Sequence, residues 1–229
     1  MRTKLLSIIF LAASTFTIMS CSDDDKAPTD YVAASAEGTY TDPRDGNEYK
    51  WVRYGNLEWM AENFRYDLND ESKCLVYDDE AEIGRLDEKK YGRLYTYTGA
   101  VEACPEGWRL PTDEDWKNLE RQMGMSNADA NKWDWRGNVA FRMMSIYDAT
   151  PQINIQTAGY YTPHMVMGLR GSRYYGVYAY FWTSSVDEQQ NKGNGFYIFR
   201  KFIYNSAQIF RQSTTSEYGM SVRYVRDAQ

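Results

Sequence analysis

The sequence is poor in the residues and motifs that build catalytic metal sites. It has one histidine, His164, and three cysteines among 229 residues, and no H-E-x-x-H, C-x-x-C or EF-hand pattern. The G-x-S-x-G elbow, the G-x-G-x-x-G fingerprint and the P-loop are missing too, which removes the usual signals of serine hydrolases and nucleotide-binding proteins. We therefore expect no metal ion and no cofactor, and we place His164 in a surface loop.

Positive charge is also scarce. The chain has 26 Lys and Arg against 32 Asp and Glu, a formal net charge of −6. Removal of an N-terminal segment that carries Arg2 and Lys4 would make the remainder more acidic still. An acidic surface argues against nucleic acid as a partner and against electrostatic docking on anionic lipid.

A short apolar stretch near the N-terminus predicts export. Leu5–Ile18 follows a basic start and is too short for a convincing transmembrane anchor, so residues 1–20 are interpreted as a signal peptide. The sequence I-M-S-C, which ends at Cys21, resembles a bacterial lipobox. That resemblance implies a diacylglyceryl group on the Cys21 thiol, which would anchor the protein in a membrane. The alternative is ordinary cleavage beside a chance cysteine.

The polar segment after Cys21 predicts a tether. Residues 21–38 are small and polar and suit a flexible linker to a domain over residues 39–229. Their start, S-D-D-D-K, resembles the acidic export signal of surface lipoproteins in Bacteroidetes-type bacteria, and the alternative is a solvated spacer. We expect an outer-membrane lipoprotein that faces either the cell surface or the periplasm.

Two cysteines remain if Cys21 carries lipid. Cys74 and Cys104 would meet oxidising conditions in an exported protein, so a disulfide between them is plausible. In the chain-entropy model such a bridge would contribute about 3–4 kcal/mol. The sequence does not show whether their Cα atoms come within bridging distance.

Aromatic residues are abundant and favour a domain rich in sheets and loops. They make up 16% of the chain, with 20 tyrosines. Hairpins are predicted over residues 39–54 and 195–211, where turn residues separate aromatic strands. A long loop is expected over 66–90, short helical pieces over 128–135 and 139–147, and a last strand over 220–226.

Two helices are predicted in the middle of the chain. Apolar residues at helical spacing place the first over Tyr95–Cys104. The second begins in E-G-W-R-L-P-T-D-E-D-W, where Thr112 suits the N-cap, Asp115 a capping box, and the other acids the positive end of the helix dipole. We therefore assign Trp108 and Trp116 to the core and not to a catalytic or sugar-reading patch.

The segment from Gly159 to Thr183 alternates tyrosines with glycines and is the candidate binding region. Tyrosine offers a large flat face with a polar tip at low entropy cost, and both sugars and proteins bind such surfaces. The alternative is that these side chains pack inward on strands. The candidate ligand-binding residues are Tyr160, Tyr161, Tyr174, Tyr175 and Tyr178.

Several motifs resemble those of a known bacterial family. These are W-M-A-E-N, Y-G-R-L-Y-T-Y, C-P-E-G-W-R-L-P-T, F-W-T-S-S and G-M-S-V-R-Y-V-R-D. Together they resemble the Fibrobacter succinogenes major paralogous domain over roughly residues 38–227. The G-W-R-L-P-T segment is also similar to formylglycine-generating enzymes. That similarity implies an α+β, C-type-lectin-like fold, with two short helices packed on small antiparallel sheets, long loops, and the N- and C-terminal strands side by side.

The sequence departs from these relatives at informative positions. The family usually ends in S-V-R-C, but Tyr224 stands in place of that cysteine, which leaves Cys74 as the available partner for Cys104. No cysteine follows Cys104, so the resemblance does not extend to formylglycine chemistry. The E-P-N or Q-P-D loop and the W-N-D strand of calcium-dependent lectins are missing as well.

These observations predict a non-catalytic, lipid-anchored protein whose lectin-like domain binds a glycan or a protein. Two alternatives stay open. One is a glycan-acting enzyme with a carboxylate pair. The other is a structural or assembly subunit of a surface complex.

Overall fold

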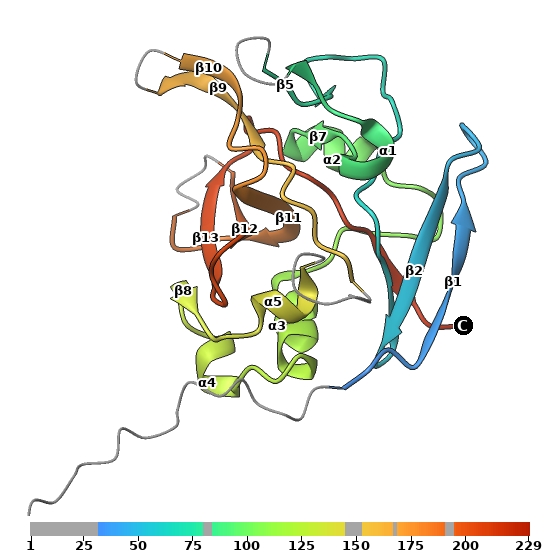
Figure 1. The fold of residues 1–229 in the computed structure, drawn as a ribbon, viewed down its shortest axis with the longest axis vertical. Coiled ribbons are helices and arrows are strands. Elements are labelled where there is room, and N and C mark those ends of the chain that lie inside the picture. The colour runs from blue at the N-terminus through green and yellow to red at the C-terminus, as the bar shows by residue number, and fades with distance from the viewer. Residues whose placement is uncertain (1–31, 80–83, 145–152, 167–168, 191–194) are drawn as a thin grey trace, which may run out of the picture.

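The computed structural model describes residues 32–79, 84–144, 153–166, 169–190 and 195–229. It is an α+β fold of small antiparallel sheets with few helices (Figure 1). The predicted signal peptide, Cys21 and most of the tether lie outside the described residues. The described chain pairs with the domain as early as Val32, whose backbone N–H donates to Gln122 (2.8 Å).

The first sheet joins both ends of the domain. Its strands lie in the order β1-β2-β3-β14, with β1 Ala36–Thr41, β2 Glu48–Tyr54, β3 Leu57–Met60 and β14 Val225–Asp227. The predicted hairpin over 39–54 is confirmed as β1 and β2. The expectation that the terminal strands lie side by side is wrong, because β2 and β3 separate β1 from β14.

The second sheet has the order β11-β12-β13-β8. Its strands are β11 Tyr178–Val186, β12 Phe196–Ile203, β13 Ile209–Thr215 and β8 Asp134–Arg136. The predicted C-terminal hairpin is confirmed as β12 and β13. The helical prediction over 128–135 is wrong at its end, because Asp134 has a φ of 60° and Trp135 pairs with Phe210 on β13.

Three short strand pairs and five helices complete the described fold. The pairs are β9 Tyr160–Val166 with β10 Leu169–Arg173, β4 Cys74–Leu75 with β7 Leu94–Tyr95, and β5 Asp78–Asp79 with β6 Gly84–Arg85. The helices are α1 Glu88–Tyr91, α2 Tyr97–Glu102, α3 Asp113–Gln122, α4 Asn127–Ala130 and α5 Ala140–Met143. Both predicted helices are present as α2 and α3, and 66–90 is more structured than the loop that was expected.

Helix α3 begins as its sequence predicts and lies between the two larger sheets (Figure 1). The Thr112 hydroxyl accepts a hydrogen bond from the Asp115 N–H, and the Asp115 carboxylate accepts one from the Thr112 N–H. Trp116 is fully buried, with ring centroids 5.1 Å from Trp59 of one sheet and 5.7 Å from Phe181 of the other. Its assignment to the core is therefore confirmed.

A second core lies between the first sheet, α2 and the aromatic side chains of β11 and β12. Trp108, 7% exposed, belongs to this cluster, as predicted. Tyr224, which replaces the cysteine usual at this position, is fully buried there and donates from its hydroxyl to the Ala100 carbonyl (2.5 Å). The substituting side chain thus ties the C-terminal segment to α2 by a hydrogen bond.

Candidate functional site

The second sheet has two chemically different faces, because alternate side chains along each strand point to opposite sides. The inner face packs on α3 and α5 and is buried. The outer face carries aromatic side chains and one lysine, and two of its aromatic residues, Trp182 and Phe199, are buried in the second core. The candidate site is this outer face.

The inner face uses its charges inside the fold. Arg211 donates two hydrogen bonds to the Asp113 carboxylate (2.8 and 2.7 Å), and Arg200 lies 2.8 Å from the same group. Glu120 pairs with Arg200 at 2.7 Å and with Arg136 at 2.9 Å. Burial opposes ionisation of Asp113, but the hydrogen bonds from Arg211 and the charge of Arg200 outweigh it and hold the pKa of that carboxyl well below its ordinary value. The charged side chains of the inner face are therefore paired with one another inside the fold.

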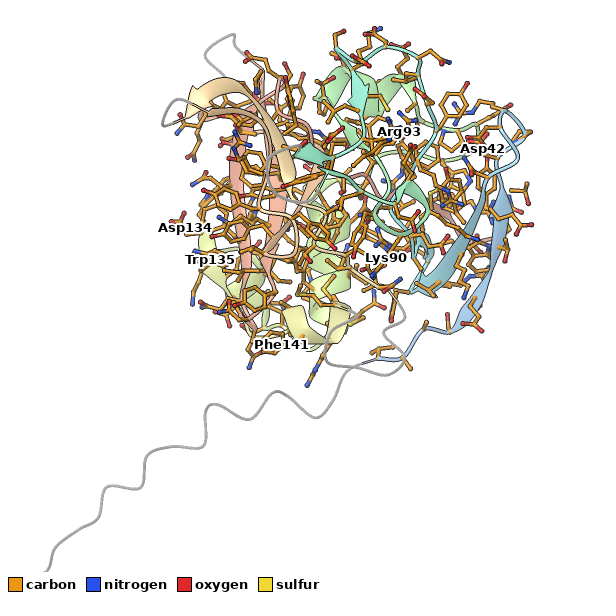
Figure 2. All side chains as sticks on the ribbon, turned by 45° about the horizontal axis from the view of Figure 1, so that its top comes forward. Asp42, Lys90, Arg93, Asp134, Trp135 and Phe141 are labelled. Atoms are coloured by element: carbon orange, nitrogen blue, oxygen red, sulfur yellow. The ribbon has the colours of Figure 1, made fainter. Side chains whose placement is uncertain are left out.

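The outer face carries a row of four side chains that crosses the whole sheet. The strand register places Tyr180 opposite Lys201, Lys201 opposite Phe210, and Phe210 opposite Trp135. We call these four residues the aromatic row. Three inter-strand steps of about 4.8 Å make it roughly 14 Å long. In Figure 2, Trp135 lies at the outer edge of the molecule beside Asp134.

Lys201 lies within this row among rings. Its Nζ atom is 4.6 Å from the ring centroid of Tyr178, 4.9 Å from Phe210, 5.2 Å from Trp135 and 5.6 Å from Tyr180. Such distances allow cation–π attraction. Burial lowers the pKa of the Lys201 ammonium.

Three of the predicted ligand-binding tyrosines lie beside the row. The ring centroid of Tyr160 is 4.7 Å from Tyr180 and 6.0 Å from Tyr174, and that of Tyr174 is 5.1 Å from Tyr178. Tyr174 is 52% exposed. Tyr160, Tyr174 and Tyr178 thus lie next to the aromatic row, while ligand binding by these residues stays a prediction.

The other two predicted tyrosines lie elsewhere. The Tyr175 hydroxyl shares a hydrogen bond with that of Tyr91 (2.9 Å), which together with burial raises the pKa of Tyr175 to about 12. Tyr161 pairs with Ser172 and lines a separate cavity with Asp67 and Arg93. Neither contributes to the aromatic row.

The sequence analysis missed Lys201, Phe210 and Trp135. The signal for Lys201 was present in F-Y-I-F-R-K-F-I, where strand alternation places it on the same face as Phe199. The sequence gives no such indication for Trp135. Regular strand alternation would place Trp133 and Trp135 on the same face, but the left-handed conformation of Asp134 puts them on different faces. The Trp133 ring stacks at 3.8 Å on the inner-face Arg211, whereas the Trp135 ring packs 5.0 Å from Phe210 on the outer face.

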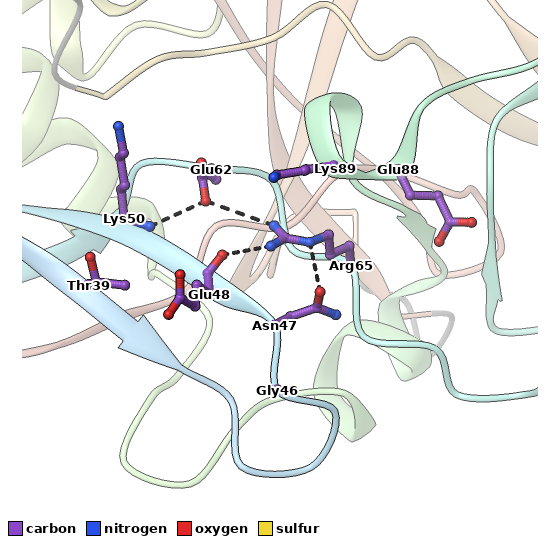
Figure 3. A pocket seen from close by; sticks show the side chains of 9 residues that line it. All are labelled: Thr39, Gly46, Asn47, Glu48, Lys50, Glu62, Arg65, Glu88 and Lys89. Carbon is purple, nitrogen blue, oxygen red and sulfur yellow. Dashed lines mark hydrogen bonds and ion pairs between the residues drawn. The ribbon is translucent and has the colours of Figure 1, made fainter.

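Cavities lie elsewhere on the described surface, with charged side chains among their lining residues. One, of about 590 Å³, lies beside the β1–β2 hairpin (Figure 3). Arg65 donates there to the Asn47 side chain (3.2 Å) and to the Glu48 carbonyl (2.6 Å), and lies 3.8 Å from Glu62. The cavity that contains Tyr161 measures about 540 Å³. In the cavity beside the hairpin, Arg65 therefore already has hydrogen-bond partners within the chain.

Cys74 and Cys104 are free thiols, so the structure does not contain the predicted disulfide. Each sulfur has other neighbours. Cys74 Sγ lies 3.6 Å from the Tyr66 carbonyl and 3.9 Å from Arg93, and Cys104 Sγ lies 3.2 Å from the Trp108 carbonyl. Burial raises the pKa of the Cys104 thiol to about 11.

Metal-binding clusters and membrane-spanning helices are both missing from the part of the chain that the structure describes. No group of three or more His, Cys, Asp and Glu side chains is arranged to hold a metal ion within it. No helix in the same residues has the length and apolar character needed to cross a membrane. His164 lies on β9 and not in the predicted loop, and its side chain is outside the described side chains.

Comparison with known proteins gives one match. No curated protein and no solved structure matches the chain. The family model of the Fibrobacter succinogenes major domain matches residues 52–226. This range contains all four residues of the aromatic row, the core tryptophans, the whole second sheet and β3 of the first sheet. The match covers more than half of the chain, and the protein therefore belongs to the Fibrobacter succinogenes major domain family.

Proposed function

We propose that this protein is a non-catalytic recognition protein that binds a saccharide along the aromatic row. A lipid on Cys21 would hold it at the outer membrane, with residues 21–38 as the tether. The observation that carries the proposal is the row itself, in which aromatic side chains and a lysine share the outer face of a sheet whose other face is core.

The row suits a saccharide better than a protein. A pyranose ring has an apolar C–H face that packs on an aromatic ring and hydroxyl groups that bond to polar tips such as those of Tyr178 and Tyr180. A stable protein interface buries about 800 Å² on each partner, whereas a row roughly 14 Å long and one side chain wide matches a short oligosaccharide. Lysine is also depleted at protein interfaces.

A C-type-lectin-like arrangement is part of the proposal. It is supported by the presence of β1 and β14, from the two ends of the domain, in one sheet, although β2 and β3 lie between them, and by α2 and α3 packed against small antiparallel sheets. The family assignment does not depend on it.

A carboxylate-pair enzyme receives less support. A general acid needs a carboxyl whose pKa is raised. Six described carboxyls have a pKa clearly shifted from its ordinary value, and hydrogen bonds to neighbours shift all six downward. They are Asp42, Glu58, Asp70, Asp113, Asp115 and Asp129.

A glycan array probed with the full-length protein in detergent tests the proposed binding. We expect binding to a subset of oligosaccharides and its loss in Trp135→Ala. Trp133→Ala is the matched control, because both indoles are 36% exposed but Trp133 stacks on Arg211. Equal binding by the two variants, or binding to none of the glycans, would refute the proposal.

The anchor and its location need separate tests. Incorporation of a labelled fatty acid into the wild-type protein, and none into Cys21→Ala, is the expected result. Protease treatment of intact cells should digest the domain if it faces outward. An unlabelled wild-type protein would contradict the lipid anchor and leave the binding proposal intact.

A further inference from the structure

Lys201 is the cation of the outer face, and its described neighbours supply no opposite charge. The side chains that surround it are Tyr178, Tyr180, Phe210 and Trp135. The next outer-face positions, Phe199 and Ile203 on its own strand and Gln212 on β13, are neutral. Asp134 on the edge strand accepts a hydrogen bond from the Gln212 amide (3.3 Å).

The environment of Lys201 differs from those of the buried arginines of the fold. Arg200, Arg211 and Arg136 each pair with Asp113 or Glu120. Arg223 is fully buried without a carboxylate partner, but it donates to the carbonyls of Met60, Ile153 and Asn154 and to the Asn63 side chain. Among the described residues, Lys201 has neither a carboxylate nor a carbonyl partner and is half-buried against rings alone.

From this we infer that the aromatic row selects acidic saccharides, with the Lys201 ammonium bound to a hexuronic acid carboxylate while the sugar rings stack on Trp135 and the adjacent tyrosines. The inference rests on the proposed function and adds the chemical class of the ligand. A carboxylate would give the ammonium the charge-assisted hydrogen bond that its protein neighbours do not supply.

The geometry favours a carboxylate attached to a sugar ring over a free anion. Rings on both sides of Lys201 along the row provide stacking surfaces, and a small inorganic anion would leave those surfaces unused. A neutral sugar would use the rings and leave the ammonium without a partner. A uronic acid uses both.

The test compares two acidic trisaccharides, each with the methyl ester that removes its negative charges. Titration calorimetry of the full-length protein in detergent would use trigalacturonate and its methyl ester, and then trimannuronate and its methyl ester. For at least one pair, we expect the acid to bind about tenfold or more tightly than the ester. That preference should shrink as ionic strength rises.

Substitutions at Lys201 assign the preference to one residue. Lys201→Met keeps an unbranched apolar side chain of similar length and should bind acid and ester equally. Lys201→Arg should restore the preference, and Trp133→Ala should retain it. Circular dichroism of each variant establishes that it is folded.

The possible outcomes separate this inference from the proposed function. Equal affinity of acid and ester in the wild-type protein, or a preference that survives Lys201→Met, overturns the role of Lys201. So does binding to neutral oligosaccharides on the array with none to the uronates, and in these cases saccharide binding on the row still stands. A glycan array with no binding overturns both.

Discussion

Arg200 and Lys201 are neighbours on β12, yet they lie in opposite environments. Arg200 points inward, is fully buried and pairs with both Asp113 and Glu120. Lys201 points outward, is half-buried and contacts aromatic rings. A buried charge needs partners in order to be tolerated, so the inner charges serve the fold. The outer charge has no such duty among the described residues and is available to a ligand.

The largest loss of stability is expected from a substitution in the core beneath the inner face of the second sheet. Trp116→Ala should lower the free energy of unfolding by about 3–5 kcal/mol, because it removes a fully buried indole between the two sheets. Trp135→Ala, on the outer face at 36% exposure, should cost much less. Urea unfolding of both variants measures the difference. Equal losses would place Trp135 in the core and remove it from the candidate site.

Substitutions at the neighbours Arg200 and Lys201 on β12 compare the two faces of the sheet most directly. Arg200→Met should cost about 3 kcal/mol, because it leaves Glu120 with Arg136 alone and weakens the set of charges around Asp113. Lys201→Met should cost less than about 1 kcal/mol, the usual range of an exposed cation–π contact. Denaturant midpoints of the two variants at neutral pH provide the measurement. A larger loss for Lys201→Met would mean that the outer lysine is structural.

A smaller loss of folding stability is expected when the pH is lowered. The pKa of Asp113 is lower in the folded state than in the unfolded chain, where it is about 3.9. Its ionised form therefore contributes stability above that value, and the contribution is lost as pH falls from about 4 toward the folded-state pKa. We expect this loss to be on the order of 2 kcal/mol.

Comparison of Asp113→Asn with the wild-type protein isolates that contribution. The variant should be less stable than the wild-type protein at pH 7, and it should lose less stability when the pH is lowered. Urea unfolding at pH 7 and at acidic pH measures both differences. Asp45→Asn is the control, since Asp45 is exposed in the turn between β1 and β2, outside the ion pairs of the inner face. An unchanged pH dependence in Asp113→Asn would show that other carboxyls dominate the acid sensitivity.

Local signals explain why part of the fold could be predicted from the sequence. The start of α3 depends on residues three apart, Thr112 and Asp115, and the β1–β2 hairpin depends on its own turn. The role of Asp113 was only partly foreseen. Its place in the first turn suits the helix dipole, but its ion pair with Arg211 joins residues 98 positions apart.

The aromatic row could not be predicted because its four members come from four strands. Their alignment depends on the register of β11, β12, β13 and β8, and the last of these is three residues long. Of the tyrosines in the tyrosine-rich segment, Tyr160, Tyr174 and Tyr178 come together through the β9–β10 hairpin and the start of β11. Tyr175 lies apart from them, because its hydroxyl bonds to that of Tyr91.

The positive φ of Asp134 has a wider consequence. One residue in the left-handed region separates two nearby indoles, so that Trp133 stacks on Arg211 and Trp135 packs against Phe210 on the outer face. Replacement of residue 134 by a β-branched amino acid, which resists that conformation, would reorient the rim of the sheet without touching the interior. A single backbone angle at the edge of the sheet thereby determines which of the two indoles completes the aromatic row.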